Sequence, residues 1–131
     1  MKISGFKMLA IAVTDVDKAK EFYTETLGLK LTGDAGHNGQ RWVSLELADG
    51  IAITLSNVHE SMKPGALKFY LGTSDVDSTQ KELSDKGVTP VKEGDDWGKW
   101  GQEGEGQHWF EITDPDGNHI LIIPSAYEHK G

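Results

Sequence analysis

The stretch TDVDKAKEFYTETLGLKL covers residues 14–31, and the stretch SDVDSTQKELSDKGVTPV covers residues 74–91. Both begin with a hydroxyl residue followed by Asp-Val-Asp, and Asp75 follows Asp15 by 60 positions. The hydroxyl residue or the first aspartate of each copy is a good helix N-cap, because its side-chain oxygen can accept backbone N–H groups of the first turn. The repeat therefore predicts two helices in corresponding positions.

Each helix is predicted to end at a glycine and to lie between two strands. Gly28 and Gly87 mark the helix ends, where a left-handed backbone suits glycine. The spacing of apolar residues predicts buried sides formed by Val16, Ala19, Phe22, Tyr23 and Leu27 in the first helix and by Val76, Thr79 and Leu83 in the second. The predicted strands before the helices are residues 6–13 and 67–73, and those after them are residues 29–31 and 88–91.

A second pair of landmarks follows each helix. ELADG at residues 46–50 resembles EITDPDG at residues 111–117, and both predict hairpin turns between strands. We match Gly50 with Gly117 and Glu46 with Glu111, which gives the second turn two extra residues. Each half then reads as strand, helix and about three strands, so two such halves are expected to share one core.

These boundaries predict a single α+β domain over residues 1–131. It contains module one at residues 6–56, a linker at 57–65, module two at 66–124 and a tail at 125–131. The linker is indicated by its Pro-Gly pair, which favours a turn or loop.

Composition excludes several classes of function. The net charge of -8 and the lack of a basic cluster argue against general nucleic-acid binding. The absence of cysteine excludes disulfides, thiolate metal ligands and cysteine nucleophiles. No long apolar run predicts a signal peptide or a membrane span, so we expect a cytoplasmic protein without a membrane partner.

Side chains alternate across a strand, which divides the predicted strands into an apolar face and a mixed face. The apolar face should pack under the helices. The mixed face contains Met8, Trp42, Glu46, Thr54, Lys68, Tyr70, Trp109, Glu111, His119 and Leu121. Large aromatic residues beside a few polar groups are typical of a ligand cavity, although an exposed face or a face covered by a partner subunit has the same pattern.

The sequence resembles the vicinal oxygen chelate superfamily, which includes glyoxalase I, bleomycin-resistance proteins and extradiol dioxygenases. The matching residues are VTDV at 13–16, FY at 22–23, LGL at 27–29, DVD at 75–77 and DPDGN at 114–118. The resemblance spans roughly residues 6–123. It implies two βαβββ modules, a cup-shaped mixed sheet with the helices on its outer face, and a homodimer.

The metal-using members of this superfamily place four ligands in the cup, on the first and last strands of each module. Those positions fall on Met8, Thr54, Lys68 and Leu121. Leucine has no donor atom, methionine prefers soft ions, and a metal would disfavour protonated lysine. We therefore predict no metal ligand at the usual site and no cofactor. Glu46, Glu111 and His119 leave open a divalent metal at an unusual site.

The remaining polar residues of the mixed face leave two roles open for Lys68. It could form a salt bridge to Glu46 or Glu111, or it could bind a ligand carboxylate. Lys68, Glu111 and His119 are also the candidate catalytic residues if the protein is an enzyme.

Residues 93–106 combine Trp97 and Trp100 with glycines and acidic residues. They are predicted to form an acidic loop, and exposed tryptophan on such a loop indicates contact with a ligand. The resemblance places this loop beside the cup, where bleomycin-resistance members hold cationic planar drugs, and it could close over a ligand. Stacking and cation–π contacts would provide the same attraction here.

Three functions remain open. The first is a metal-free protein that binds an aromatic or cationic organic molecule, in which Trp97 and Trp100 join the mixed-face residues in the ligand site. The second is a lyase, isomerase or dioxygenase with an unusual site. The third is a structural or regulatory dimer whose aromatic residues fill the cup. We favour the first, because the usual metal ligands are missing.

Overall fold

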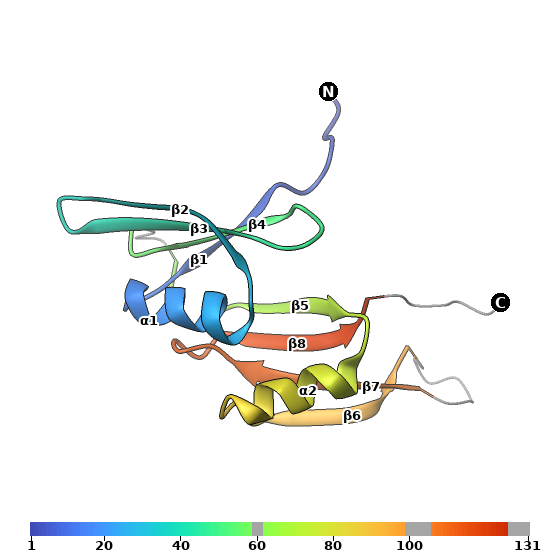
Figure 1. Ribbon diagram of the computed structural model, residues 1–131. Coiled ribbons are helices and arrows are strands. Elements are labelled where there is room, and N and C mark those ends of the chain that lie inside the picture. Colours follow the sequence, from blue (N-terminus) through green and yellow to red (C-terminus); the bar gives the residue numbers. More distant parts are fainter. Residues whose placement is uncertain (59–61, 99–105, 126–131) are drawn as a thin grey trace. The chain divides into compact units, whose positions relative to one another are not determined.

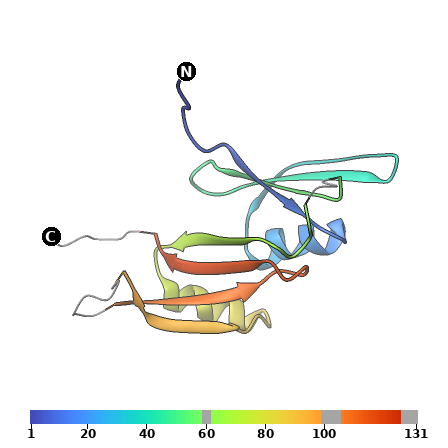
Figure 2. The ribbon, with the colours of Figure 1, turned by 180° about the vertical axis from the view of Figure 1, so that it is seen from behind.

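The computed structural model describes residues 1–58, 62–98 and 106–125, and the chain divides into two compact units. Unit 1 contains Met1–Ala66 and Pro115–Gly117, whereas unit 2 contains Leu67–Asp114 and the chain from Asn118 onward. Figures 1 and 2 show a helix beside a four-stranded sheet in each unit. The α+β class and the two βαβββ modules are thus confirmed, whereas the predicted domain boundaries and the shared cup stay predictions.

Unit 1 has its strands in the order β1-β4-β3-β2. The pair β1–β4 is parallel, and the pairs β3–β4 and β2–β3 are antiparallel. The helix α1 continues directly into a wider π-helical turn, η1. The elements are β1 Met8–Ala12, α1 Val16–Glu21, η1 Phe22–Thr26, β2 Lys30–His37, β3 Gln40–Glu46 and β4 Ala52–Ser56.

Unit 2 repeats this arrangement, with strand order β5-β8-β7-β6. Here β5–β8 is the parallel pair, and β7–β8 and β6–β7 are antiparallel. The elements are β5 Lys68–Thr73, α2 Val76–Asp85, β6 Lys92–Trp97, β7 Gln107–Thr113 and β8 His119–Pro124. No helix in the described ranges of either unit is long and apolar enough to span a membrane.

The repeated Asp-Val-Asp motif caps both helices, as predicted. Asp15 accepts a hydrogen bond from the backbone N–H of Lys18 at 3.1 Å, and Asp75 accepts one from Ser78 at 3.0 Å. The hydrogen bonds from Ser78 lower the pKa of the Asp75 carboxyl. Beyond the helices, Gly28 and Gly87 have φ angles of 75° and 85°, which confirms the predicted left-handed ends.

The apolar face of each sheet packs beneath its own helix. In unit 1, Val16, Ala19 and Tyr23 of the helix are buried, whereas Phe22 and Leu27 are only half-buried. In unit 2, the helix buries Val76 and Leu83, and Thr79 is half-buried. The fully buried side chains of the sheets include Ile11, Val43, Leu45, Leu55, Phe110, Ile112 and Ile120.

Two strand predictions need correction. The strand after the first helix runs from Lys30 to His37, well beyond the predicted residues 29–31. The strand after the second helix is β6, at Lys92–Trp97, and not residues 88–91. Pro90 lacks a backbone N–H and suits a position before the strand. Residues 93–97 were assigned to a loop because of their polarity, but an edge strand tolerates charged side chains.

The match between the two hairpin turns also needs correction. The N–H of Leu47 donates to the carbonyl of Ile51, and the N–H of Asp114 donates to that of Asn118. The two turns therefore have the same length, and the second has no extra residues. Strand register places Val43 opposite Leu55 and Phe110 opposite Ile122. Hence Trp42 corresponds to Trp109, and Glu46 corresponds to Thr113 rather than to Glu111.

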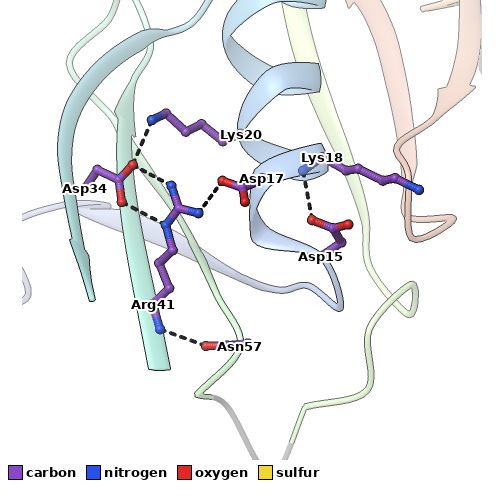
Figure 3. A network of polar contacts seen from close by, with 7 residues as sticks. All are labelled: Asp15, Asp17, Lys18, Lys20, Asp34, Arg41 and Asn57. Atoms are coloured by element: carbon purple, nitrogen blue, oxygen red, sulfur yellow. Dashed lines mark hydrogen bonds and ion pairs between the residues drawn. The ribbon is translucent and has the colours of Figure 1, made fainter. Parts of the chain in front are cut away.

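A charged network joins the helix of unit 1 to strands β2 and β3 (Figure 3). Asp34 accepts hydrogen bonds from Arg41 at 2.7 Å and 3.0 Å and from Lys20 at 2.7 Å. Arg41 also pairs with Asp17 on the helix. The bonds from Arg41 and then Lys20 hold the pKa of Asp34 far below its ordinary value. The bonds to Asp34 and then Asp17 raise the pKa of Arg41.

Candidate ligand-binding site

On the mixed face of the unit 1 sheet, a central row of small side chains lies between rows that contain larger ones. The Cα register aligns Ala10 of β1, Thr54 of β4 and Ser44 of β3 in one row across the sheet. Neighbouring rows contain Met8 with Ala52 and Glu46, and Ala12 with Ser56 and Trp42. Four predicted ligand residues, Met8, Trp42, Glu46 and Thr54, thus lie on this face, and their role in binding stays a prediction.

Thr54 lies in the middle of that central row and is buried, with 2% of its surface exposed. Its Oγ1 atom has no hydrogen-bond partner within the described residues. A buried hydroxyl without a partner is uncommon and costs stability. This oxygen is thus an unused donor and acceptor on the face predicted to bind a ligand.

Trp42 lines a shallow pocket of about 230 Å³ near the hairpin that joins β2 to β3. The pocket is lined by Ala35, Gly36, His37, Gln40, Arg41, Trp42 and Val58. Register places Ala35 opposite Trp42, so the small side chain leaves space beside the indole. A cavity of this size suits one ring system rather than a large molecule. His37, the last residue of strand β2, belongs to this pocket.

In unit 2, two aromatic rings from opposite edges of the sheet meet above the mixed face. Tyr70 is on edge strand β5 and Trp97 is on edge strand β6, with β8 and β7 between them. Their ring centroids are only 5.8 Å apart, with the planes tilted by 42°. Adjacent strands lie about 4.8 Å apart, so the rings must reach over the central strands. Each strand contributes one ring to an aromatic surface.

Two residues on the same face as these rings are almost completely buried. Leu121 has 6% and Glu111 has 8% of its surface exposed. Register places Leu121 beside both Tyr70 and Glu111. One apolar and one acidic side chain are thus buried on the face that carries the aromatic pair.

The indole of Trp109 closely approaches the neighbouring strand β6, which has a glycine at the contact. A Cβ atom on Gly94 would be 2.7 Å from Nε1 of Trp109, too close for any real side chain. The indole N–H donates to Oδ1 of Asp96 at 2.6 Å. Gly94 and Asp96 therefore fix the plane and the rotation of the Trp109 ring.

Glu111 is paired with His119 and not with Lys68. Nδ1 of His119 is 3.2 Å from Oε2 of Glu111. Lys68 is opposite His119 in the register of β5 and β8, but it forms no ion pair with any described residue. A salt bridge to Glu111 was one of the roles left open for Lys68. The structure pairs one oxygen of that carboxylate with His119 instead.

The four positions where the resemblance leads us to expect metal ligands carry side chains that suit a divalent ion poorly. Met8 and Lys68 are exposed, whereas Thr54 and Leu121 are buried. Neither the thioether nor the neutral hydroxyl is a good ligand for a hard ion, and leucine offers no donor. Among residues 1–58, 62–98 and 106–125, no group of three His, Cys, Asp or Glu side chains could hold a metal.

One polar cluster was missed from the sequence. Nε2 of His108 is 2.6 Å from Oε1 of Gln80, and Nδ1 is 3.0 Å from Oδ1 of Asp95. Glu93 and Asp77 each have an oxygen 3.9 Å from Nε2. With the corrected match between modules, His108 corresponds to Arg41 of unit 1. The corrected register could have revealed this cluster, but the mismatched turns concealed it.

All but one of the predicted site residues lie on a mixed face. Met8, Trp42, Glu46 and Thr54 belong to unit 1. The set in unit 2 is Lys68, Tyr70, Trp97, Trp109, Glu111, His119 and Leu121. Trp100 lies outside the described residues.

The model of the Glyoxalase/Bleomycin resistance protein/Dioxygenase superfamily matches residues 5–122. A curated relative, the uncharacterized protein YurT of Bacillus subtilis (strain 168), is 32% identical over 102 residues, which cover 66% of this chain and 80% of the relative.

Two solved structures resemble the chain over nearly its full length. TnmS3, an antibiotic binding protein from Streptomyces sp. CB03234, is 32% identical with a TM-score of 0.74, covering 95% of this chain and 99% of its own. A superfamily member from Sphaerobacter thermophilus DSM 20745 is 29% identical with a TM-score of 0.73, covering 92% and 96%.

Proposed function

Because the chain belongs to the glyoxalase/bleomycin resistance protein/dioxygenase superfamily, we propose that it is a small-molecule-binding protein that holds an aromatic organic ligand without a metal ion. The observation that carries this proposal is the contact between Tyr70 and Trp97 across the mixed face of unit 2. Paired rings offer a ligand both a stacking surface and an apolar edge.

Three further observations support ligand binding over a purely structural role. Trp42 adjoins a pocket in unit 1, and Thr54 has an unused hydroxyl on the same face. Trp109 is held in a fixed rotation by Asp96, which limits the entropy lost when a ring stacks on it. TnmS3, which is similar over nearly the whole chain, is an antibiotic binding protein. We extend the proposal to a homodimer, as the family resemblance implies, and to a cytoplasmic location, as expected from the sequence.

Isothermal titration calorimetry against a panel of planar aromatic antibiotics tests the proposal. We expect at least one compound to bind with a Kd of about 1–100 μM, without added metal. Tyr70→Leu and Trp97→Leu should each weaken that binding, because each removes one ring of the pair. Phe22→Leu, which changes a half-buried ring in the helical turn, is the matched control and should bind normally. Equal affinity in all four proteins would refute the assigned surface.

A second candidate function is favoured by the contact between His119 and Glu111. When Nδ1–H of His119 donates to Glu111, Nε2 keeps its lone pair, and the half-exposed ring can accept a proton from a ligand. This arrangement suits general acid–base catalysis that needs no metal. In that case, mass spectrometry should show conversion of a bound compound by the native protein, and His119→Gln should bind it unchanged without converting it.

A further inference from the structure

We propose that the ligand is an aromatic acid, whose ring lies against Tyr70 and Trp97 and whose anionic group binds Lys68. This inference rests on the proposed function and adds the charge of the ligand. It differs from the cationic drugs expected from the family resemblance, because the described charges on this face favour an anion.

Lys68 is the first residue of β5 and is exposed on the mixed face. Within β5 its backbone pairs with β8, but its side chain forms neither a hydrogen bond nor an ion pair with any residue in the described ranges. An ammonium group in this position can move to meet a ligand without breaking an existing contact. Because it has no partner to lose, the full benefit of a new charge-assisted hydrogen bond is available to the complex.

The acidic groups of this face are already engaged. Glu111 is 8% exposed and lies 3.2 Å from His119, while Asp96 accepts the indole N–H of Trp109 at 2.6 Å. Lys92, opposite Glu111 on β6, adds a second ammonium group. A cationic ligand would therefore meet carboxylates that already accept a hydrogen bond and, at Glu111, are largely buried, whereas an anion would meet an exposed lysine without a side-chain partner.

The spacing between the two features suits one small molecule. Lys68 and Tyr70 are two residues apart on one strand, so both side chains are on the same face. A strand rises about 3.3 Å per residue, which separates their Cα atoms by roughly 7 Å. A carboxylate attached directly or through a short linker to a bicyclic ring can span that distance. The net charge of -8 does not oppose this, because exposed charges beyond about 8 Å are largely screened at physiological salt.

Three probes with the same ring test the charge preference by calorimetry: 2-naphthylacetic acid, 2-naphthylacetamide and 2-(2-naphthyl)ethylamine. We expect the acid to bind at least about tenfold more tightly than the amide or the amine, the effect of one charge-assisted hydrogen bond. Lys68→Met, which keeps most of the aliphatic stem, should remove that preference. Lys81→Met, at an exposed position on helix α2, is the matched control and should keep it.

The other outcomes separate the two proposals. If the amine binds as tightly as the acid and needs Tyr70 and Trp97, the aromatic site stands and the inference about charge is wrong. If the acid is preferred equally by the native protein and by Lys68→Met, the anion is held elsewhere and the inference is also wrong. If no probe and no compound of the antibiotic panel binds, the proposed function itself fails.

Discussion

Thr54 breaks an ordinary rule of protein interiors, that buried polar atoms form hydrogen bonds. Its hydroxyl is buried without a partner among the described residues, in a row with Ala10 and Ser44. An unsatisfied buried polar atom loses its hydrogen bonds with water and gains none in return. Functional sites are where such uncompensated groups tend to persist.

Thr54→Val should raise the free energy of unfolding by about 1 kcal/mol, because valine keeps the shape and removes the unsatisfied oxygen. Urea denaturation followed by tryptophan fluorescence measures the change. Thr79→Val is the matched control, since the Thr79 hydroxyl donates to the carbonyl of Asp75 at 2.8 Å. In the control, the free energy of unfolding should fall by about 1 kcal/mol. A loss of similar size in both variants would show that the Thr54 hydroxyl has a partner.

Sequence reasoning worked best at the scale of single residues with local roles. The N-caps at Asp15 and Asp75 and the left-handed glycines depend only on residues within one turn, so their chemistry is readable from the sequence. The partner of Glu111 was not readable in this way. Both His119 and Lys68 are on its face, and only the positions of the side chains decide between them.

At the scale of elements, strand β6 shows how a polar edge strand supports an aromatic site. Its glycine, Gly94, makes room for the Trp109 ring, and its last residue, Trp97, contacts Tyr70. The sequence indicated a loop here because residues 93–97 lack the alternating apolar pattern of a strand. An edge strand of a small sheet does not need that pattern when its neighbours provide the core.

Gly94→Ala should destabilise the protein by about 1–3 kcal/mol and move the Trp109 ring, because the added methyl group would overlap the indole. Urea denaturation measures the first effect, and the tryptophan emission spectrum reports the second. Gly33→Ala is the control on the corresponding edge of unit 1, where the nearest atom to a new Cβ is 3.7 Å away. Equal effects of the two substitutions would argue against a specific role for Gly94.

The polar contacts between helix and strands differ between the two units, although they involve corresponding positions of the repeat. Arg41 of unit 1 and His108 of unit 2 occupy corresponding positions, and each faces an aspartate on its helix, Asp17 or Asp77. The sequence did not reveal this correspondence because the two turns were matched with a shift of two residues. A permanent charge therefore joins helix to strand in unit 1, whereas a titratable group does so in unit 2.

Asp34→Asn should lower the melting temperature at neutral pH. The difference in melting temperature between the variant and the native protein should become smaller as the pH falls. The native pKa of Asp34 is lowered, so the ionised carboxylate stabilises the fold above its ordinary pKa of about 4 and loses this effect as the pH falls toward the native value. Melting temperatures of both proteins from pH 7 to pH 2.5 measure the gap. A gap that stays constant below pH 4 would contradict the assigned network.

At the scale of the whole molecule, the two modules followed from the repeat and the family followed from the resemblance of its motifs, whereas the function followed from neither. Superfamily members share the fold but differ in chemistry, so the identity of a few side chains decides activity. The sequence alone showed that four expected ligand positions carry poor metal ligands, which argues against metal chemistry. These positions are Met8, Thr54, Lys68 and Leu121. The contact between Tyr70 and Trp97 was not readable from the sequence, because it joins residues on opposite edges of one sheet.

Native mass spectrometry of the protein tests the central claim most directly. The protein is equilibrated with equimolar Zn²⁺, Ni²⁺ and Mn²⁺ and with the compound of the antibiotic panel that binds best, both separately and together. We expect a stoichiometric organic adduct that forms without metal and is lost in the double variant Tyr70→Leu/Trp97→Leu. A stoichiometric metal adduct, with the organic compound bound only in its presence, would contradict metal-free binding and point to a metal-dependent enzyme.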